Sequence, residues 1–503
     1  MKSAGGPIWY DNSTAENHGT IVSIGESPAK AGVVWVGTDD GNVQVTPDSG
    51  KTWNNVVGNL PKELNESWVS HVEPSRTSAT TAYVALDRHF WDDYGPHIFK
   101  TTDTGKTFAR VTNGLPAKAY VHVVREDPKN PQLLYAGTEV GLFVSWNAGG
   151  SWQRLAAKNL PNVAIHDIVV HPRENDLILG THGRSILILD DIAALQQPPG
   201  EGTKLYAPRV TYRFANRGAG GGMDDGGSKV FKGANPRYGA PITFSVAGTG
   251  TAKVEIVDAS GKVIREVSEA TGGRGRAAAP AARTAGLQRL VWDLRHEGPK
   301  IRRAAAEGAE EGPGVARGPK AAPGVYTVRL TVGTTKLEEK FEVRLDPGLT
   351  ASAADLQEQL TYGLKLRDMQ SEVNTTLKAI DALKDQIRAM ETRGRAETGL
   401  RGQLGPLADW QKALDQETLK IGLPATANRL EDAPGLAERL VNLSGIIDGP
   451  NAAPLPQQVA HFAEVEKEYN DNLPGVKAFL RTQVPVWNAV LTKLNLGTLP
   501  IPR

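Results

Sequence analysis

The sequence contains no cysteine, almost no net charge and no long apolar run. The absence of cysteine excludes disulfide bonds, thiolate zinc sites and thiol catalysis. The 57 Lys and Arg residues balance the 56 Asp and Glu residues, so overall charge favours neither nucleic acid nor an anionic membrane as a partner. No apolar run approaches the roughly 18 to 20 residues that span a bilayer. Residues 1–7 also lack the apolar segment of a secretory signal.

One short pattern recurs three times, at residues 46–53 (TPDSGKTW), 101–108 (TTDTGKTF) and 145–152 (SWNAGGSW). In each copy an Asp or Asn side chain can accept hydrogen bonds from nearby backbone N–H groups, and Gly supplies the positive φ of a tight turn. We therefore expect structural hairpin turns whose final aromatic residue packs into the core. The residues of these turns are Asp48, Gly50, Trp53, Asp103, Gly105, Phe108, Asn147, Gly149 and Trp152.

Short β-rich runs surround these turns. Residues 33–38, 81–86, 133–138 and 177–181 each precede a turn, and each follows another apolar run that ends in a Pro-containing turn. Short strands grouped in units of about 40 to 50 residues are typical of β-propeller blades. The sequence therefore predicts about four blades over residues 1–195. Propellers have about four to eight blades, so four blades can close a small ring or form part of a larger one.

The repeated turn resembles the Asp-box, or BNR repeat, of sialidase-like and sortilin-like β-propellers. The whole chain is similar to the C-terminal half of a bacterial family of BNR-repeat, sortilin-N-terminal-domain (VPS10-like) proteins that are often called glycosyl hydrolases. The stretches that carry this similarity are residues 35–41 (WVGTDDG), 124–129 (VREDPK), 135–139 (YAGTE), 181–191 (THGRSILILDD), 286–295 (GLQRLVWDLR) and 323–330 (PGVYTVRL). The resemblance implies further blades, either upstream or on a second chain, and a periplasmic, secreted or cell-surface location.

The length of 503 residues predicts about three domains. After the blades, residues 196–235 have the composition of a linker with a flexible Gly-rich segment. Alternating apolar residues over 236–346 then predict an immunoglobulin-like β-sandwich. Two Ala/Gly/Arg/Pro-rich insertions, 271–286 and 298–322, interrupt it and are expected to be disordered or draped over the surface.

The period of the apolar pattern changes to three and four residues over 347–503, which predicts an antiparallel helical bundle. Thr350 or Ser352 is a suitable N-cap for the first helix, and Asp355 is favourable in its first turn. Pro and Gly residues separate three further helices, expected near 402–420, 434–443 and 455–494. We expect the apolar stripe of these helices to form their common core.

Ligands of propellers usually bind the face where the second-to-third-strand loops meet the entries to the first strands. The longest such loop here, residues 87–94, places aromatic rings beside carboxylates and an Arg. This composition suits a sugar or a peptide, and the alternative is a packed, salt-bridged loop that plugs the channel. The predicted ligand-binding residues are Trp68, Arg88, His89, Trp91, Tyr94, His182 and Arg184.

Glycosidase chemistry would require two carboxyl groups about 5 to 10 Å apart. The candidates for catalytic carboxylates are Asp39, Asp40, Asp92, Asp93 and Glu139. The arginine motif that opens a sialidase is absent from this chain.

No metal site is assigned from the sequence. Asp39, Asp40 and Glu139 supply oxygen ligands suited to Ca²⁺, and His182 with His166 would suit a transition metal. Their spacing along the chain is not that of a local metal-binding motif. His122 is expected to be an ordinary strand residue.

The sequence therefore predicts a mainly β protein with Asp-box propeller blades, a sandwich and a C-terminal helical bundle. The favoured function is a non-catalytic, exported scaffold that recognises a peptide, a glycan or a partner protein on the propeller face. The alternatives are a glycoside hydrolase of sialidase-like or related type, and a structural subunit whose ring a second chain completes.

Overall fold

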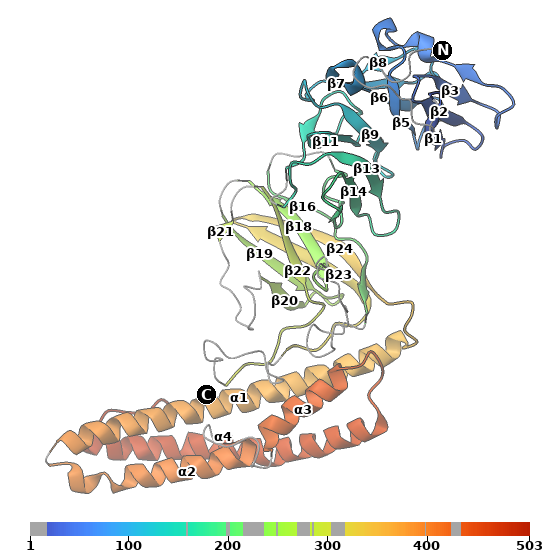
Figure 1. Ribbon diagram of the computed structural model, residues 1–503. Coiled ribbons are helices and arrows are strands. Elements are labelled where there is room, and N and C mark those ends of the chain that lie inside the picture. Colours follow the sequence, from blue (N-terminus) through green and yellow to red (C-terminus); the bar gives the residue numbers. More distant parts are fainter. Residues whose placement is uncertain are drawn as a thin grey trace. The chain divides into compact units, whose positions relative to one another are not determined.

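The computed structural model describes residues 18–156, 159–197, 202–214, 236–247, 250–268, 282–283, 286–302, 317–397, 399–423 and 434–502. The chain divides into two compact units, Met1–Gly200 and Glu201–Arg503. The first unit is built of small antiparallel sheets like propeller blades, and the second combines two further sheets with a four-helix region (Figure 1).

Four sheets follow one another along the first unit, and each is antiparallel with its strands in chain order. The first sheet contains β1 (Ile21–Glu26), β2 (Val34–Thr38), β3 (Val43–Thr46) and β4 (Asn54–Asn55). The second contains β5 (Trp68–Pro74), β6 (Ala82–Arg88), β7 (Asp93–Thr101) and β8 (Ala109–Arg110). The third contains β9 (Val121–Glu126), β10 (Leu134–Thr138), β11 (Gly141–Ser145) and β12 (Gln153–Arg154). The fourth contains β13 (Ile165–Val170), β14 (Leu177–Thr181) and β15 (Ile186–Leu189).

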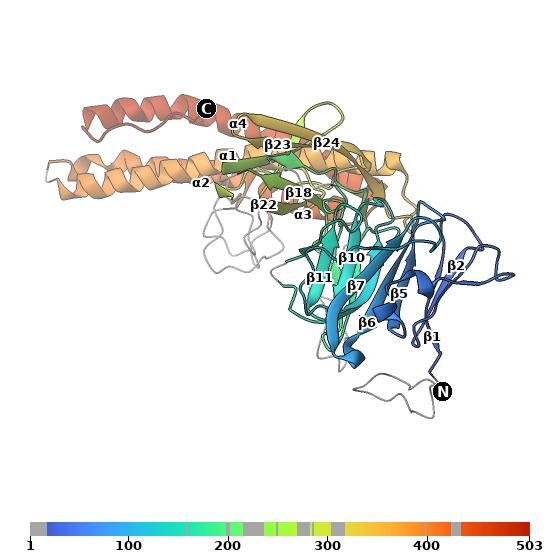
Figure 2. The same cartoon turned by 90° about the horizontal axis from the view of Figure 1, so that it is seen from above.

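Neighbouring sheets of this unit share their apolar cores. Buried side chains of the first and second sheets form one cluster, which includes Trp35 and Phe99. A second cluster joins the second and third sheets, and a third joins the third and fourth. Figure 2 shows the strands of the second and third sheets side by side. Stacked sheets that bury alternate side chains between them are the packing expected of propeller blades.

The three repeated turns are closed by hydrogen bonds between the same positions. In the first, the Asp48 carboxylate accepts from the Thr52 backbone N–H at 2.9 Å and from the Thr52 hydroxyl at 2.7 Å. Asp103 makes the same two bonds with Thr107. Asn147 accepts from the Ser151 backbone N–H, and its amide nitrogen donates to the Ser151 hydroxyl. The glycines Gly50, Gly105 and Gly149 all have positive φ, 83°, 81° and 91°.

The aromatic residues that end these turns differ in burial. Trp152 is 3% exposed and donates from Nε1 to the Val111 carbonyl of the second sheet at 2.8 Å. Phe108 packs on the cluster between the first and second sheets. Trp53 is 45% exposed, contrary to the expectation that it enters the core. The physical reason is that each turn packs against the sheet before it, and within the described residues no sheet precedes the first.

The second unit contains two sheets that pack around one core. The smaller is ordered β16 (Lys204–Leu205), β18 (Ala240–Val246) and β22 (Gly286–Trp292). The larger is ordered β17 (Thr211–Arg213), β24 (Thr335–Leu345), β23 (Gly324–Val332), β19 (Gly250–Val257) and β20 (Val263–Val267), with β21 (Ala282–Arg283) paired to β19. The shared core includes Phe244 and Trp292 from one sheet and Ile256 and Val328 from the other.

Part of the predicted linker over 196–235 lies in these sheets. β16 pairs with β18, and β17 runs parallel to β24. Leu205 is 5% exposed and Arg213 is fully buried. Packing against the sheets therefore orders this segment, although its amino-acid composition is that of a linker. The Gly-rich part of the predicted linker, and most of the predicted insertions 271–286 and 298–322, lie outside the described residues.

The helical region contains α1 (Ala353–Ala396), α2 (Gly405–Ile421), α3 (Leu436–Asp448) and α4 (Pro456–Lys493). The Ser352 side chain accepts from the Asp355 N–H, and Asp355 accepts from the Ser352 N–H, which caps α1. Leu377, Leu414, Leu440 and other buried residues of the four helices form a single core. No helix among the described residues is both long and apolar enough to cross a membrane.

Buried polar contacts join the helices to the sheets within the second unit. Arg213 donates to the Ala321 carbonyl at 2.8 Å and to the side chains of Gln359 and Asn451. Asp448 at the end of α3 pairs with Arg295 at 2.6 Å. The segments 236–346 and 347–503, expected to be separate domains, therefore lie in one compact unit.

Candidate functional site

One end of the first unit carries the turns β2–β3, β6–β7, β10–β11 and β14–β15, and it is called the loop face below. The residue after the Thr that ends the second strand is Asp39, Glu139 or His182 in the first, third and fourth sheets. The backbone N–H of each donates to the carbonyl of the residue preceding the first strand, at 3.1, 3.1 and 3.0 Å. The three positions are therefore structurally equivalent, although their side chains differ in charge.

Two histidines enter this face from equivalent β-bulges. In β9 the register jumps from Val121 to Val123 and skips His122. In β13 it jumps from Ile165 to Asp167 and skips His166. A bulge changes the direction of the extra residue's side chain. Both imidazoles therefore depart from the regular alternation of side chains between the two faces of the sheet. Because the third and fourth sheets pack together, the two rings stack with centroids 4.0 Å apart.

These histidines belong to a continuous series of rings across the second, third and fourth sheets, called the ring row below. The row is Trp68, Phe90, His89, Tyr120, His122, His166 and His182, with centroids of successive rings 6.1, 3.9, 4.9, 5.1, 4.0 and 4.9 Å apart. Tyr94, whose side chain is 42% exposed, joins the row at Tyr120 with centroids 6.2 Å apart. The structure thus brings together Trp68, His89, Tyr94 and His182 of the predicted ligand-binding residues.

The loop over residues 87–94 is braced internally. Arg88 donates to the Ser67 hydroxyl at 2.9 Å, lies 5.4 Å from the Trp91 ring and pairs with Asp93 at 3.5 Å. Partial burial would raise the pKa of Asp93, but hydrogen bonds from Gly95 and His97 outweigh it and hold that pKa below its usual value. Asp92 adopts a left-handed conformation with φ 63°. The rings of this loop are consequently held in place before any ligand arrives.

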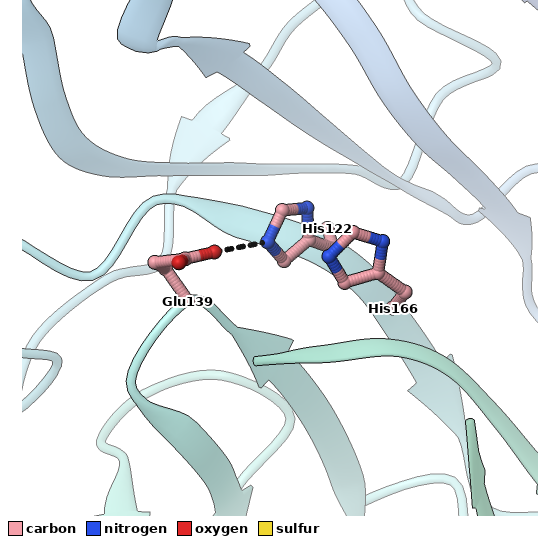
Figure 3. A group of neighbouring side chains, drawn as sticks. All are labelled: His122, Glu139 and His166. Carbon is pink, nitrogen blue, oxygen red and sulfur yellow. Dashed lines mark hydrogen bonds and ion pairs between the residues drawn. The ribbon is translucent and has the colours of Figure 1, made fainter. Parts of the chain in front are cut away.

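Glu139 connects the ring row to a carboxylate. Its Oε2 atom lies 3.0 Å from Nε2 of His122, and Figure 3 shows the two imidazoles face to face on one side of this carboxylate. Burial, and then the neighbouring Glu139, raises the pKa of Tyr120. Partial desolvation lowers the pKa of His166, and the nearby imidazoles of His122 and His182 lower it further.

The candidate catalytic carboxylates have other partners. Asp39 is 5% exposed and accepts from the Gly19 N–H at 2.6 Å. Asp40 accepts from the Thr38 hydroxyl and from the Asn42 amide. Within the described residues one group of three or more possible metal ligands occurs, and it contains Glu139 with His122 and His166. Asp39 and Asp40 therefore do not join Glu139 in a Ca²⁺ site of this structure.

Sequence reasoning set His122 aside as a strand residue and did not single out Phe90 or Tyr120. The signal that would have found His122 is the alignment of first strands, in which His122 and His166 occupy the same position of successive sheets. Arg184, also predicted, is exposed on the turn that carries His182, and its backbone N–H donates to Thr181 at 3.1 Å.

No protein-family model and no curated protein matches the chain. Among solved structures, it is similar to YCF48 from Cyanidioschyzon merolae, with 19% identity and a TM-score of 0.28 over 34% of this chain and 53% of that one. It is also similar to the GH74 xyloglucanase from Xanthomonas campestris, with 12% identity and a TM-score of 0.31 over 64% of this chain and 45% of that one. A structure of YCF48 bound to D1 peptide is 12% identical, with a TM-score of 0.27 over 50% of this chain and 68% of that one.

The chain thus spans about half the length of the first two structures, 53% and 45%. The resemblance is to β-propeller proteins at low identity, and it assigns no family. TM-scores of 0.27 to 0.31 carry no argument about function.

Proposed function

We propose that this chain is a non-catalytic binding protein whose loop face recognises an extended segment of polypeptide. The observation that carries the proposal is the ring row, which crosses three sheets and ends in the exposed imidazoles of His166 and His182. Export to the periplasm or cell surface, implied by the family resemblance, is part of the same proposal.

The stacking of the row favours a peptide over a glycan. Sugars bind aromatic residues by lying flat on exposed ring faces. Here the rings of His89 and Tyr120, and those of His122 and His166, stack on one another's faces with centroids 4.9 and 4.0 Å apart. What the row offers to solvent is therefore its edges, which carry the N–H and O–H groups of histidine and tyrosine. Such edges suit the carbonyl and carboxylate oxygens of a peptide.

The hydrolase alternative has less support, because Asp39, Asp40 and Asp93 each hold a turn or an ion pair.

We also propose that the two sheets of the second unit form an immunoglobulin-like sandwich. Its support is their shared core around the buried Trp292.

Selection from a phage-displayed library of random peptides tests the binding proposal. We expect enriched peptides whose affinity falls by roughly tenfold or more in Tyr94→Ala and in His89→Ala, since aromatic residues at the centre of an interface dominate its energy. Phe214→Ala is the matched control, because Phe214 is an aromatic residue of the second unit that is 44% exposed, close to the 42% of Tyr94. No enrichment, or peptides indifferent to both variants, would refute the proposal. Release of sugar from glycosides would instead support the hydrolase.

A second candidate function, a structural subunit, is favoured by the two outer sheets of the first unit. The first sheet exposes Ile21 by 53%, Ile24 by 66% and Trp53 by 45%, and the fourth exposes Ile186 by 64% and Ile188 by 58%. Apolar side chains gathered on such faces mark contact surfaces. We propose that each face docks a further Asp-box sheet carried by a second polypeptide, which completes the ring.

A further inference from the structure

We propose that His122, Glu139 and His166 on the loop face bind one divalent transition-metal ion, of which Zn²⁺ is the best match. Their ligand atoms all lie within 4.8 Å of one another. Two imidazoles with one carboxylate form a ligand set that Zn²⁺ accepts in proteins, with water at the remaining position. Two of these ligands, His122 and His166, also belong to the ring row. Neither Tyr94 nor His89 is a ligand, so the variants that test peptide binding and those that test metal binding are different.

The backbone explains why these three side chains converge. His122 and His166 occupy matching bulges in neighbouring first strands, and Glu139 follows the strand that pairs with β9. The third and fourth sheets approach closely at Gly137, where an added Cβ would lie 2.5 Å from the Ile165 carbonyl oxygen. This close contact fixes the His166 backbone beside the third sheet. The two histidines therefore come from strands of two packed sheets, and Glu139 comes from the turn that follows β10.

Only a small adjustment would close the site around an ion. Ligands 2.0–2.2 Å from a tetrahedral ion lie roughly 3.4 Å from one another. The His122 and Glu139 atoms are already 3.0 Å apart, in the bond drawn in Figure 3. The remaining movement falls on the exposed His166 ring and on Glu139, whose side chain is 42% exposed. Both can turn about their side-chain bonds without disturbing the core.

Neighbouring groups complete the arrangement. The Tyr120 ring packs edge-on against His122 with centroids 5.1 Å apart and supports that ligand, as outer partners of metal ligands do. The His182 ring lies tilted against that of His166, with centroids 4.9 Å apart. We expect it to support the site without being one of its three main ligands. Solvent reaches the site through the exposed His166, so the ion keeps an exchangeable position.

Titration of the metal-free full chain with ZnCl₂, in competition with a chromogenic chelator, tests this proposal. We expect one equivalent of Zn²⁺ to bind saturably. Glu139→Gln and His166→Ala should each weaken binding by more than about tenfold, and His182→Ala by less. His461→Ala is the matched control, since His461 is an exposed histidine on α4 whose side chain is 42% exposed. That variant should bind Zn²⁺ like the unsubstituted chain.

Co²⁺ gives a second measurement that does not depend on affinity. We expect visible d–d bands typical of nitrogen and oxygen ligands, lost in His122→Ala and retained in His461→Ala. Equal thermal melting of the metal-free variants would show that the substitutions leave the fold intact. Failure to bind one equivalent of Zn²⁺, or binding that none of the His122, Glu139 and His166 substitutions weakens, would overturn the proposal.

Discussion

At the scale of single residues, His296 shows how burial sets a protonation state. The residue is 6% exposed, and its Nε2 atom is buried without a hydrogen-bond partner in the described part of the chain. Burial, helped by the positive charge of Arg367, lowers its pKa to about 4. An unfolded histidine has a pKa near 6.5. At pH values between the two pKa values, the imidazole is therefore protonated in the unfolded state and neutral in the folded state.

His296 should therefore make the second unit lose stability as the pH falls from about 6.5 to about 4. Between pH 7 and pH 5 this residue should account for a loss of about 2 kcal/mol. Urea unfolding at both pH values, followed by pulsed hydrogen exchange of β22, measures the change in the second unit alone. His296→Leu should lose less stability over this range, and the surface variant His461→Leu should behave like the unsubstituted chain. Equal losses in all three proteins would contradict the prediction.

At the scale of elements, Arg125 of β9 ties three sheets together. Its guanidinium donates to Glu73 of β5 at 2.8 Å, to Asp167 of β13 at 3.2 Å and to the Ile168 carbonyl at 2.8 Å. Glu73 is 4% exposed, and its other oxygen accepts from the Glu126 N–H at 3.1 Å. Burial raises the pKa of Glu73, and the charge of Arg125 opposes that rise. The carboxylate thus depends on Arg125 for its charge partner.

Arg125→Met should destabilise the first unit by about 3–5 kcal/mol, because it leaves a buried carboxylate without its partner. Adding Glu73→Gln removes that uncompensated charge, so the double variant should regain part of the loss. A double-mutant cycle measured by urea unfolding gives the coupling energy, which we expect to exceed about 1 kcal/mol. Strictly additive costs would show that the ion pair does not hold the sheets together.

Local signals predicted much of this architecture, whereas the site depends on contacts between elements. The capping of α1 by Ser352 and Asp355 follows from adjacent residues, and the sequence anticipated it. The pairing of β17 with β24 was not anticipated, since nothing within residues 211–213 specifies a partner so far along the chain. His122 was set aside as a strand residue for a related reason. A bulge exists only relative to the neighbouring strand, so its place beside His166 follows from register and sheet packing.

At the scale of the whole molecule, equivalent glycines distinguish inner sheets from outer ones. An added Cβ at Gly105 would lie 2.9 Å from Val56 of the preceding sheet, whereas at Gly50 the nearest atom is 3.7 Å away. Likewise, Gly137 meets the Ile165 carbonyl oxygen at 2.5 Å, and Gly180 has nothing closer than 3.5 Å. Gly50 and Gly180 therefore occupy positions where, in the interior of the unit, an adjoining sheet would pack.

Gly105→Ala and Gly50→Ala should consequently differ in the isolated chain. Their φ angles, 81° and 83°, impose the same backbone strain of about 1–2 kcal/mol. Gly105→Ala should lower the free energy of unfolding by about 1–3 kcal/mol more than Gly50→Ala, because its methyl group overpacks Val56.

If a second polypeptide covers the first sheet, native protein from its source should exceed the 53.9 kDa of one chain by mass photometry. Gly50→Ala should then weaken that assembly by roughly tenfold or more, by the same overpacking. A particle of one chain, or an assembly that tolerates Gly50→Ala and Gly180→Ala alike, would exclude sheet-to-sheet docking at these two faces.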